Sequence, residues 1–566
     1  MPSSNLNAEV TSLNQHQAPL APNGAELGAA KHKLRQDLLL ALSVSALLTA
    51  GLVCWFSFDH HNPTTDEAGH VLSSIAYGDL LRHSRPLNLS WWHKMLTVST
   101  FYPPSAYFIG GVLKLLLHES RSADVALQAF YCATLSLSTF ACARMLGLTS
   151  IGAAIAALVI GLYPGMVTLN HSFFLDLPLA SMVAFGMAAL LFWYRKPTLR
   201  VSLVVGLAVG FACLTKQLVA CFLVAAAATL VLQLFLEKRL ALLPLLLRIG
   251  LIGLGAAAVA LPWVVTNIDA TIGLAKYNRE SMAGSHNIVQ RGFLSNLAFY
   301  GLSLIRNGSP WLFAVALLAM ISAKAKEHKN LLPVSASAAG GILLISTLNW
   351  CDLYARYTMS ALIAMAIYTG LAGEKLIESG RKGKFVVALT LTIAMLQYLA
   401  LYFTPYPLAN SVADALVTGQ KNIPEWCRPE FSAPVPRDTW GAHEALDFVE
   451  KSDHATACWL NIMINQAELN AHTLQLLVAE RNSPVRPTTS LQWTLAGDKV
   501  DFSPATACYY QWYLLKTGTT GYKFFDSKNA ANFDALIKFV TESGKFHKKW
   551  TFRTPDGQYL SLYRQQ

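Results

Sequence analysis

The basic stretch Lys31-His32-Lys33-Leu34-Arg35 stands directly before an apolar run at residues 37–57, and the polar stretch His60-His61-Asn62-Pro63-Thr64-Thr65-Asp66-Glu67-Ala68-Gly69-His70 follows that run. A helix needs about 20 apolar residues to cross the hydrocarbon core of a bilayer. Basic residues concentrate on the cytoplasmic side of such helices. We therefore expect a cytoplasmic N-terminus, a first membrane span, and the pair Asp66-Glu67 in a polar loop on the outer face.

The composition of the whole chain agrees with this reading. Of its 566 residues, 53% are hydrophobic and only 14% are charged, with a mean hydropathy of +0.38, whereas soluble domains carry about 25% charged residues. The net charge of +11 comes mostly from short basic clusters between apolar runs, as the positive-inside rule produces. These numbers argue against a nucleic-acid partner and predict a polytopic α-helical protein of the cell (inner) membrane.

Further apolar segments follow the first. They lie at about residues 104–118, 123–143, 148–163, 172–194, 200–215, 217–236, 243–265, 309–323, 331–348, 357–375 and 385–403. The basic loops between them fit one orientation from residue 172 onward. Before residue 172, three segments lie between Asp66 and Asp176. Both residues are expected on the outer face, so the number of spans between them must be even. Either 104–118 or 148–163 is therefore re-entrant or merged, and we predict about 11 spans, with 13 possible.

The sequence divides into three parts. Residues 1–35 are polar and predict a disordered cytoplasmic tail. Residues 36–404 form the transmembrane region, with large outer loops at 58–103 and 267–308, and the second loop contains a predicted interfacial helix from Phe293 to Ile305. Residues 405–566 predict an extracytoplasmic mixed α/β domain.

Local patterns within that last domain predict its elements. Helices are expected at 440–451, 467–480 and 531–543, strands at 455–464 and 507–515, and a terminal β-hairpin around Pro555-Asp556-Gly557. Cys458 and Cys508 fall on the two predicted strands. They could form a disulfide in an oxidising compartment or remain two separate buried thiols.

Ionisable residues at a membrane boundary are costly and usually functional. The predicted topology places the following polar residues at the outer face: Asp66, Glu67, His70, Tyr102, His171, Asp176, Lys216, Lys276, Arg279, His286, Arg291, Asp352, Arg356 and Tyr357. These residues are the candidates for a functional site.

Taken alone, each candidate has a functional and a structural reading. Asp66-Glu67 could supply a general base for an acceptor, or be a solvated pair of acids in a loop. Asp176 starts an apolar run with Pro178 two residues later, which is also typical of a helix N-terminus. Arg356 could bind a phosphate through its planar guanidinium or reach out to the membrane interface.

Lys216, like Arg356, could bind a phosphate or reach out to the membrane interface. His286 and His70 could bind a metal, but isolated histidines do not make a ligand set, and the nine cysteines show no metal-binding spacing. The sequence therefore leaves any divalent metal undetermined. It contains no phosphate-binding P-loop and no dinucleotide fingerprint, so no nucleotide cofactor is expected.

Several motifs occur in order along the chain. They are Asp66-Glu67, Tyr102-Pro103-Pro104-Ser105-Ala106-Tyr107, Phe174-Leu175-Asp176-Leu177-Pro178-Leu179, Arg356-Tyr357 and the hairpin Thr551–Tyr563. This series resembles the GT-C glycosyltransferases that use lipid-phosphate sugars. The nearest groups are the bacterial relatives of protein O-mannosyltransferase and of the lipid A aminoarabinose transferase (glycosyltransferase families 39 and 83).

The resemblance implies a membrane glycosyltransferase that takes a hexosyl or pentosyl group from a polyprenyl-phosphate-linked donor at the extracytoplasmic face. The acceptor would be a protein, a lipid or a glycan, so protein glycosylation and lipid A modification are both implied settings. Asp66 would be the base and Asp176 would support the site. Arg356, Tyr357, Lys216, Tyr102 and His286 would bind the substrates.

One position departs from these families. Residue 102 is Tyr where the lipid A branch has Lys and the eukaryotic mannosyltransferases have His, so the positive partner of the phosphate must come from elsewhere. Two readings compete with this one: a transporter or flippase for a lipid-linked substrate, and a structural or assembly membrane protein whose outer domain binds a partner. Transporters typically show internal repeats and charges at mid-membrane, whereas the ionisable residues here collect at one face.

Overall fold

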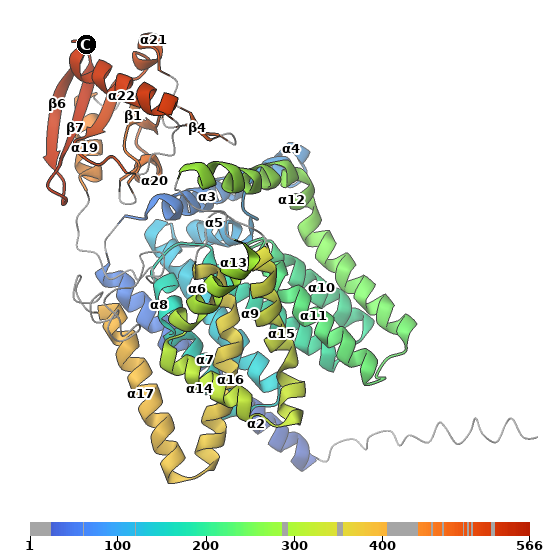
Figure 1. Ribbon diagram of the computed structural model, residues 1–566. Coiled ribbons are helices and arrows are strands. Elements are labelled where there is room, and N and C mark those ends of the chain that lie inside the picture. The colour runs from blue at the N-terminus through green and yellow to red at the C-terminus, as the bar shows by residue number, and fades with distance from the viewer. Residues whose placement is uncertain are drawn as a thin grey trace, which may run out of the picture.

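The computed structural model describes residues 24–59, 62–118, 120–285, 292–347, 355–403, 440–453, 457–466, 469–490, 492–494, 497–499, 502–521 and 527–566. A bundle of long helices makes up most of the chain, and a smaller α/β domain at the C-terminus lies over one end of it (Figure 1). We call this end of the bundle the outer end. It is the end that the sequence analysis assigns to the extracytoplasmic face.

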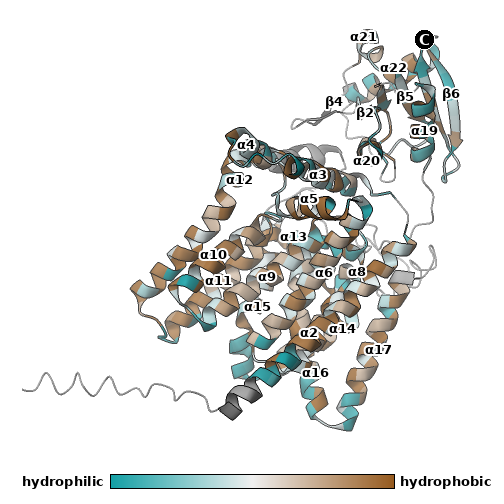
Figure 2. Ribbon diagram, turned by 180° about the vertical axis from the view of Figure 1, so that it is seen from behind, coloured by the Kyte–Doolittle hydropathy of each residue, from teal (hydrophilic) through white to brown (hydrophobic). Residues whose placement is uncertain are grey.

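Eight helical segments in the described part of the chain are long and apolar enough to cross a membrane. They are α2 (Gly24–Phe58), α6 (Ser120–Met145), α9 (Asp176–Arg195), α11 (Val219–Leu236), α12 (Leu242–Ser285), α15 (Ala325–Thr347), η1 with α16 (Ala355–Ala361 and Leu362–Glu378) and α17 (Arg381–Phe403). Hydrophobic residues follow these helices along their length (Figure 2). The chain is therefore a multi-pass membrane protein, as the sequence predicts.

Three further segments complete the bundle. α7 (Ser150–Leu162) with α8 (Pro164–Asn170), and α13 (Phe293–Asn307) with α14 (Pro310–Ser322), are bent pairs with angles of 64° and 105°. The shorter α10 (Leu199–Cys213) packs along α12 so closely that a Cβ at Gly206 would lie 2.4 Å from the Ile252 carbonyl oxygen. By length and composition, the described helices supply eight spans, or up to ten if each bent pair is one span, so the predicted number of about 11 stays a prediction.

The segment that does not cross is α5 (Ser105–Leu117). At its start, Ser105 Oγ lies 2.7 Å from Thr215 Oγ1, and near its end Lys114 Nζ lies 2.8 Å from Ser120 Oγ at the beginning of α6. α6 itself begins at the outer end. Both ends of α5 therefore lie there, and the helix runs flat beneath α3 (Figure 1). Of the two suspects, 104–118 therefore lies along the outer end, whereas 148–163 belongs to the bent pair α7–α8, which is either a broken span or a re-entrant loop.

The first outer segment is not a plain loop. It contains α3 (Thr65–Arg82) and α4 (Leu89–Thr97), so Asp66 and Glu67 occupy the first helical turn of α3. Thr64 is the N-cap, and its backbone N–H donates to the Glu67 carboxylate at 2.9 Å, as in a capping box. The expected polar loop is corrected here. Two Ser, two Gly and one His among the 18 residues of α3 weaken its helical pattern.

The C-terminal domain is built on a five-stranded sheet with the order β2-β1-β5-β7-β6. Its elements are α19 (Ala442–Ser452), β1 (Trp459–Ile462), α20 (Ala471–Arg481), β2 (Arg486–Thr488), β3 (Gln492–Thr494), β4 (Gly497–Lys499), α21 (Pro504–Ala507), β5 (Trp512–Lys516), α22 (Ser527–Glu542), β6 (Phe546–Arg553) and β7 (Tyr559–Gln565). β1 pairs in parallel with β2 and β5, and the predicted hairpin is the antiparallel pair β6–β7. α19 and α20 cover one face, and α22 covers the other.

Some sequence-based boundaries differ from the structure. Residues 24–35, expected in a disordered tail, belong to α2, and the expected strand at 507–515 begins only at Trp512. Cys508 consequently follows the short helix α21, and both Cys458 and Cys508 are free. Residues 404–439, the start of the predicted outer domain, lie outside the described residues.

The C-terminal domain contacts the bundle at the start of α3. Thr473 Oγ1 on α20 donates to the Pro63 carbonyl at 3.4 Å, and His443 Nε2 lies 3.2 Å from Asn62 Oδ1. The domain therefore lies next to the turn that carries Asp66.

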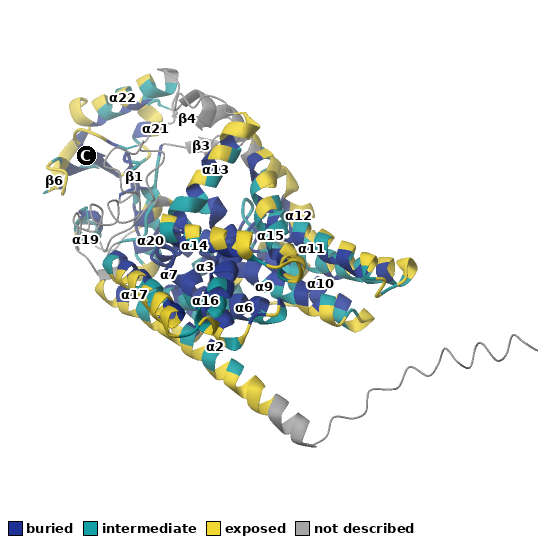
Figure 3. Cartoon of the chain, turned by 60° about the horizontal axis from the view of Figure 1, so that its bottom comes forward, coloured by how far each residue is buried: buried dark blue, intermediate teal, exposed yellow. Residues whose placement is uncertain are grey.

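The helices of the bundle interior, α7, α9 and α16, are largely buried, whereas α2, α12 and α17 expose long apolar faces (Figure 3).

Candidate functional site

Asp176 is the centre of a charged cluster at the outer end. It is the first residue of α9, and only 1% of it is exposed. Its Oδ1 lies 2.7 Å from Lys216 Nζ, and its Oδ2 lies 3.2 Å from Arg356 Nε. A buried charge is tolerated only when it is paired, and here one carboxylate pairs with two cations. The pairs explain why an acid can stand at the start of an apolar helix.

Two loops distant in sequence position Lys216. The turn between α10 and α11 is joined to the segment before α5, because the Ser105 backbone N–H donates to the Leu214 carbonyl at 2.9 Å and Gln217 Nε2 donates to the Phe101 carbonyl at 2.7 Å. These bonds flank Lys216 on both sides in sequence. They hold the Tyr102-Pro103-Pro104 segment against the turn that carries the lysine.

Aromatic rings surround the two cations. Lys216 Nζ lies 4.9 Å from the centre of the Tyr357 ring, and the Arg356 guanidinium lies 4.5 Å from the centre of the Phe174 ring. Such contacts stabilise a cation by up to about 2 kcal/mol when it is removed from water. Tyr357 is itself buried. The cluster is thus a fixed basic site with a low-dielectric wall.

α3 brings Asp66 and His70 to the same cluster. Asp66 is exposed in the first turn, and His70 follows one helical turn later on the same face. His70 Nδ1 lies 2.8 Å from the Tyr107 hydroxyl, and its ring meets the Tyr102 ring edge-on at 5.6 Å. The motif 102–107 therefore contacts α3 through two of its tyrosines.

The charges of the cluster act on His70. Burial lowers the pKa of His70 to about 4; Asp66 and Asp176 oppose that change, whereas Lys216 and Arg356 add to it. Burial likewise raises the pKa of Tyr102 to about 12, helped by Asp66. Asp66, Asp176, Lys216 and Arg356 thus act electrostatically on one histidine, although they are spread over almost 300 residues of the sequence.

The shifted pKa of His70 predicts how stability depends on pH. A histidine in the unfolded chain titrates near 6.5, whereas the folded pKa is about 4, so the unfolded chain binds the proton first as the pH falls. The folded state should lose stability between about pH 6.5 and 4 and be unaffected above that range. The thermal unfolding midpoint of His70→Gln should then fall less than that of wild type between pH 7 and 4.5. His83 is exposed, so His83→Gln is the control. The prediction would be contradicted if the unfolding midpoints of wild type, His70→Gln and His83→Gln fell equally with pH.

The carboxylate of Glu67 binds backbone N–H groups instead of the cations of this cluster. It is 2% exposed, and its carboxylate accepts the backbone N–H of Thr64 at 2.9 Å and that of Phe173 at 2.8 Å. It therefore ties the first turn of α3 to the segment just before Asp176. The geometry favours a structural role for Glu67 over the catalytic role expected from the sequence.

Glu67→Gln should lower the free energy of unfolding by about 1–3 kcal/mol, because a buried N–H loses its charged acceptor. Denaturant or thermal unfolding in detergent would measure the loss. Asp79→Asn, on the exposed side of the same helix, is the matched control and should leave stability unchanged. If Glu67→Gln proved as stable as Asp79→Asn, the hydrogen bond from Phe173 to Glu67 would not contribute to the free energy of unfolding.

The remaining candidates do not join the cluster. Lys276 is exposed on α12, and buried His171 stacks on Trp55 with 3.8 Å between ring centres. His286, Arg291 and Asp352 lie outside the described residues, and the side chain of Arg279 is likewise not described. Among the residues that are described, no group of three or more His, Cys, Asp or Glu side chains is placed to hold a metal ion.

Two parts of the site were not predicted from sequence. The motif that begins at Phe174 gives this residue no role of its own, and its contact with Arg356 depends on how α9 meets η1. Tyr107 was likewise quoted without a role, and its bond to His70 depends on the packing of α5 on α3. The spacing of Asp66 and His70 was the available signal, since residues four apart share a helical face. This spacing indicates a shared face only if residues 66–70 are helical, which the sequence did not predict.

Comparison with known proteins shows similarity in structure alone. No protein-family model matches the sequence, and no curated protein matches it. The crystal structure of ArnT from Cupriavidus metallidurans bound to undecaprenyl phosphate aligns over 93% of this chain and 97% of that chain, at 12% identity and a TM-score of 0.56. Its apo form aligns over 94% and 98%, at 14% identity and a TM-score of 0.53.

A third solved structure, the arabinofuranosyltransferase AftD from Mycobacteria, aligns over 94% of this chain but 40% of that longer chain, at 14% identity and a TM-score of 0.50. All three are GT-C glycosyltransferases. The chain therefore has the GT-C fold, which confirms the fold that the ordered motifs predict.

Proposed function

We propose that this protein is a membrane glycosyltransferase that transfers a sugar from a polyprenyl-phosphate-linked donor to an acceptor at its outer face. The observation that carries the proposal is the arrangement of charges around Asp176. Lys216 and Arg356 share one buried carboxylate, so the cluster keeps an excess positive charge next to the exposed Asp66. A phosphodiester carries a single negative charge and would balance that excess.

The departure at Tyr102 fits this arrangement. A neutral tyrosine cannot supply the cation that other members of the resembling families place at this position. The bonds from Ser105 and Gln217 instead hold Lys216 beside the same segment. Lys216 and Arg356 are therefore proposed to bind the donor phosphate in place of a cation at residue 102. Arg suits this task because its planar guanidinium can hold two phosphate oxygens at once.

The chemistry then follows from the placement of Asp66. Its carboxylate accepts the proton of the acceptor's hydroxyl or amine, and the freed electron pair attacks the anomeric carbon of the sugar. The bond from that carbon to the phosphate oxygen breaks, and the polyprenyl phosphate leaves with the electron pair. Lys216 and Arg356 stabilise the negative charge that grows on the leaving phosphate. Asp176 holds both cations in place.

One comparison and one feature of the sequence support the donor class. The similar ArnT structure contains undecaprenyl phosphate, and the sequence has no nucleotide-binding motif that would suit a nucleotide sugar. The alternative, a flippase for a lipid-linked substrate, would need charges along the path across the membrane. The cluster described here lies at one end of the bundle.

The proposal is tested by incubating the purified protein in nanodiscs with a polyprenyl-phosphate-linked pentose or hexose and measuring the release of polyprenyl phosphate. Wild type should release it, whereas Arg356→Lys and Lys216→Met should be impaired. Lys276→Gln, which removes an exposed outer cation away from the cluster, is the matched control. Movement of the lipid-linked sugar across liposomes without release would favour the flippase instead.

A further inference from the structure

A cavity lies at the end of the bundle opposite the Asp176 cluster. It has a volume of about 210 Å³ and is formed between the ends of α6, α9 and α11 and the start of α15. α9 begins at Asp176 and ends at Arg195, so the two sites are separated by about 30 Å at 1.5 Å per residue. The cavity therefore lies a full membrane thickness away from the proposed chemistry.

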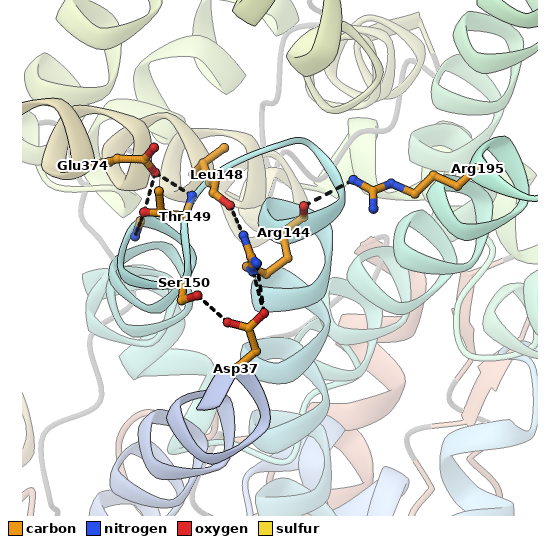
Figure 4. A network of polar contacts seen from close by, with 8 residues as sticks. Asp37, Arg144, Leu148, Thr149, Ser150, Arg195 and Glu374 are labelled. Atoms are coloured by element: carbon orange, nitrogen blue, oxygen red, sulfur yellow. Dashed lines mark hydrogen bonds and ion pairs between the residues drawn. The ribbon is translucent and has the colours of Figure 1, made fainter. Parts of the chain in front are cut away.

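The wall of this cavity is held rigidly. The turn after α6 forms one side. Just before it, Arg144 in the last turn of α6 is bound to Asp37 of α2 by two bonds of 3.0 and 2.9 Å (Figure 4). The Thr149 backbone N–H at the other end of this turn donates to Glu374 of α16 at 2.7 Å. On the opposite side, Gln233 Nε2 donates to the Lys329 carbonyl at 2.8 Å. The cavity is thus preformed between fixed helices.

The rim of the cavity is basic. Arg195 Nη2 donates to the Met145 carbonyl at 2.6 Å and lies 3.4 Å from the Arg144 carbonyl oxygen (Figure 4). A guanidinium has five N–H donors, so others remain for a ligand. Lys329 is well exposed and pairs with Glu237 at 2.9 Å. Arg239 adds a third cation, with its guanidinium 4.8 Å from the Tyr194 ring. Two cations, Arg195 and Lys329, thus line the cavity, and Arg239 and Glu237 lie next to the lining residues Tyr194 and Lys329.

The floor of the cavity is apolar, with Leu191, Leu230 and Pro333 among its lining residues. Next to it, the end of α11 exposes Leu232, Phe235 and Leu236 to the outside of the bundle. A ligand that fits this arrangement has an anionic head beside the cations and apolar chains along the exposed helix. A free inorganic anion would gain nothing from the apolar part.

We propose that this cavity binds the phosphate headgroup of an anionic phospholipid from the membrane leaflet opposite the C-terminal domain. Basic pockets between transmembrane helices on the cytoplasmic side bind anionic headgroups in other membrane proteins. Arg195 and Lys329 contact the phosphate, and the acyl chains lie against the end of α11. The proposal is independent of the reaction at Asp176.

Native mass spectrometry of the purified full chain tests this by titration with phosphatidylglycerol and, separately, with phosphatidylcholine. Wild type should bind phosphatidylglycerol in preference to phosphatidylcholine. Lys329→Gln should weaken phosphatidylglycerol binding by roughly fivefold, the effect of one basic residue at a membrane surface. Glu237→Gln should strengthen it, because the competing carboxylate is removed.

Two further variants separate the cavity from general surface charge. Asn330→Trp fills the opening from an exposed position without changing any charge, and it should abolish the preference. Lys326→Gln removes an exposed cation of the same end that does not line the cavity, and it should bind as wild type does. Wild-type binding by both Lys329→Gln and Asn330→Trp would overturn the proposal. Equal binding of the two lipids, or displacement of phosphatidylglycerol by millimolar inorganic phosphate, would do so as well.

Discussion

Asp66→Asn should lower the rate of sugar transfer by about 10²–10⁴-fold, the usual contribution of a general base. The substitution keeps the shape of the side chain and removes its capacity to accept the acceptor's proton. Asp66 is exposed and Thr64, not Asp66, caps α3, so the fold should be retained. The measurement is transfer from the polyprenyl-phosphate-linked donor under saturating substrates.

The pattern of kinetic constants distinguishes a base from a binding residue. Loss of a group that acts only in the transition state lowers kcat and kcat/KM equally, so donor binding should be unchanged. Asp79→Asn on the same helix is the control and should be fully active, since Asp79 is an exposed partner of Arg82. An Asp66→Asn protein that transfers sugar at the wild-type rate would remove Asp66 from the mechanism.

The second large effect concerns stability. Asp176→Asn should lower the free energy of unfolding by about 3–5 kcal/mol, because it leaves Lys216 and Arg356 buried without their counter-charge. Both cations are mostly buried at this position, with side-chain exposures of 9% and 12%. Unfolding followed in detergent by tryptophan fluorescence would measure the loss. Activity should be lost together with stability.

A double substitution tests the physical reason. If uncompensated charge is the cause, Asp176→Asn combined with Lys216→Met should be more stable than Asp176→Asn alone. The matched control is Asp37→Asn, which breaks a less buried ion pair with Arg144 at the opposite end of the bundle. Strictly additive losses for the Asp176 and Lys216 substitutions would show that the ion pair is not the source of the effect.

The residues of the proposed site can be identified from the sequence, but their contacts cannot. Asp66, Asp176, Lys216 and Arg356 were all identified from sequence, because apolar runs and basic loops assign each of them to the same outer face. That reasoning gives only the depth of each residue in the membrane. It could not show that Lys216 and Arg356 share one carboxylate, since this depends on how α9, η1 and the α10–α11 turn pack.

Glu67 shows the opposite case. It is a catalytic candidate by sequence as the neighbour of Asp66, although adjacent side chains generally point different ways, and the structure buries it against the Phe173 backbone. Adjacent residues on a helix point about 100° apart, so the two carboxylates had to diverge once their segment became helical. Sequence patterns did not predict that helix, because α3 carries no clear apolar stripe.

By itself, the sequence determined the membrane class of this protein, the order of its apolar segments and the α/β nature of its last domain. These follow from local hydrophobicity and turn chemistry, which act within about 20 residues. Only the tertiary structure decided that α5 lies flat at the outer end, that Glu67 braces α3, and that Asp176 pairs with two cations. Each of these depends on contacts between segments far apart in the chain, and such contacts are set by side-chain packing and by the need to pair every buried charge.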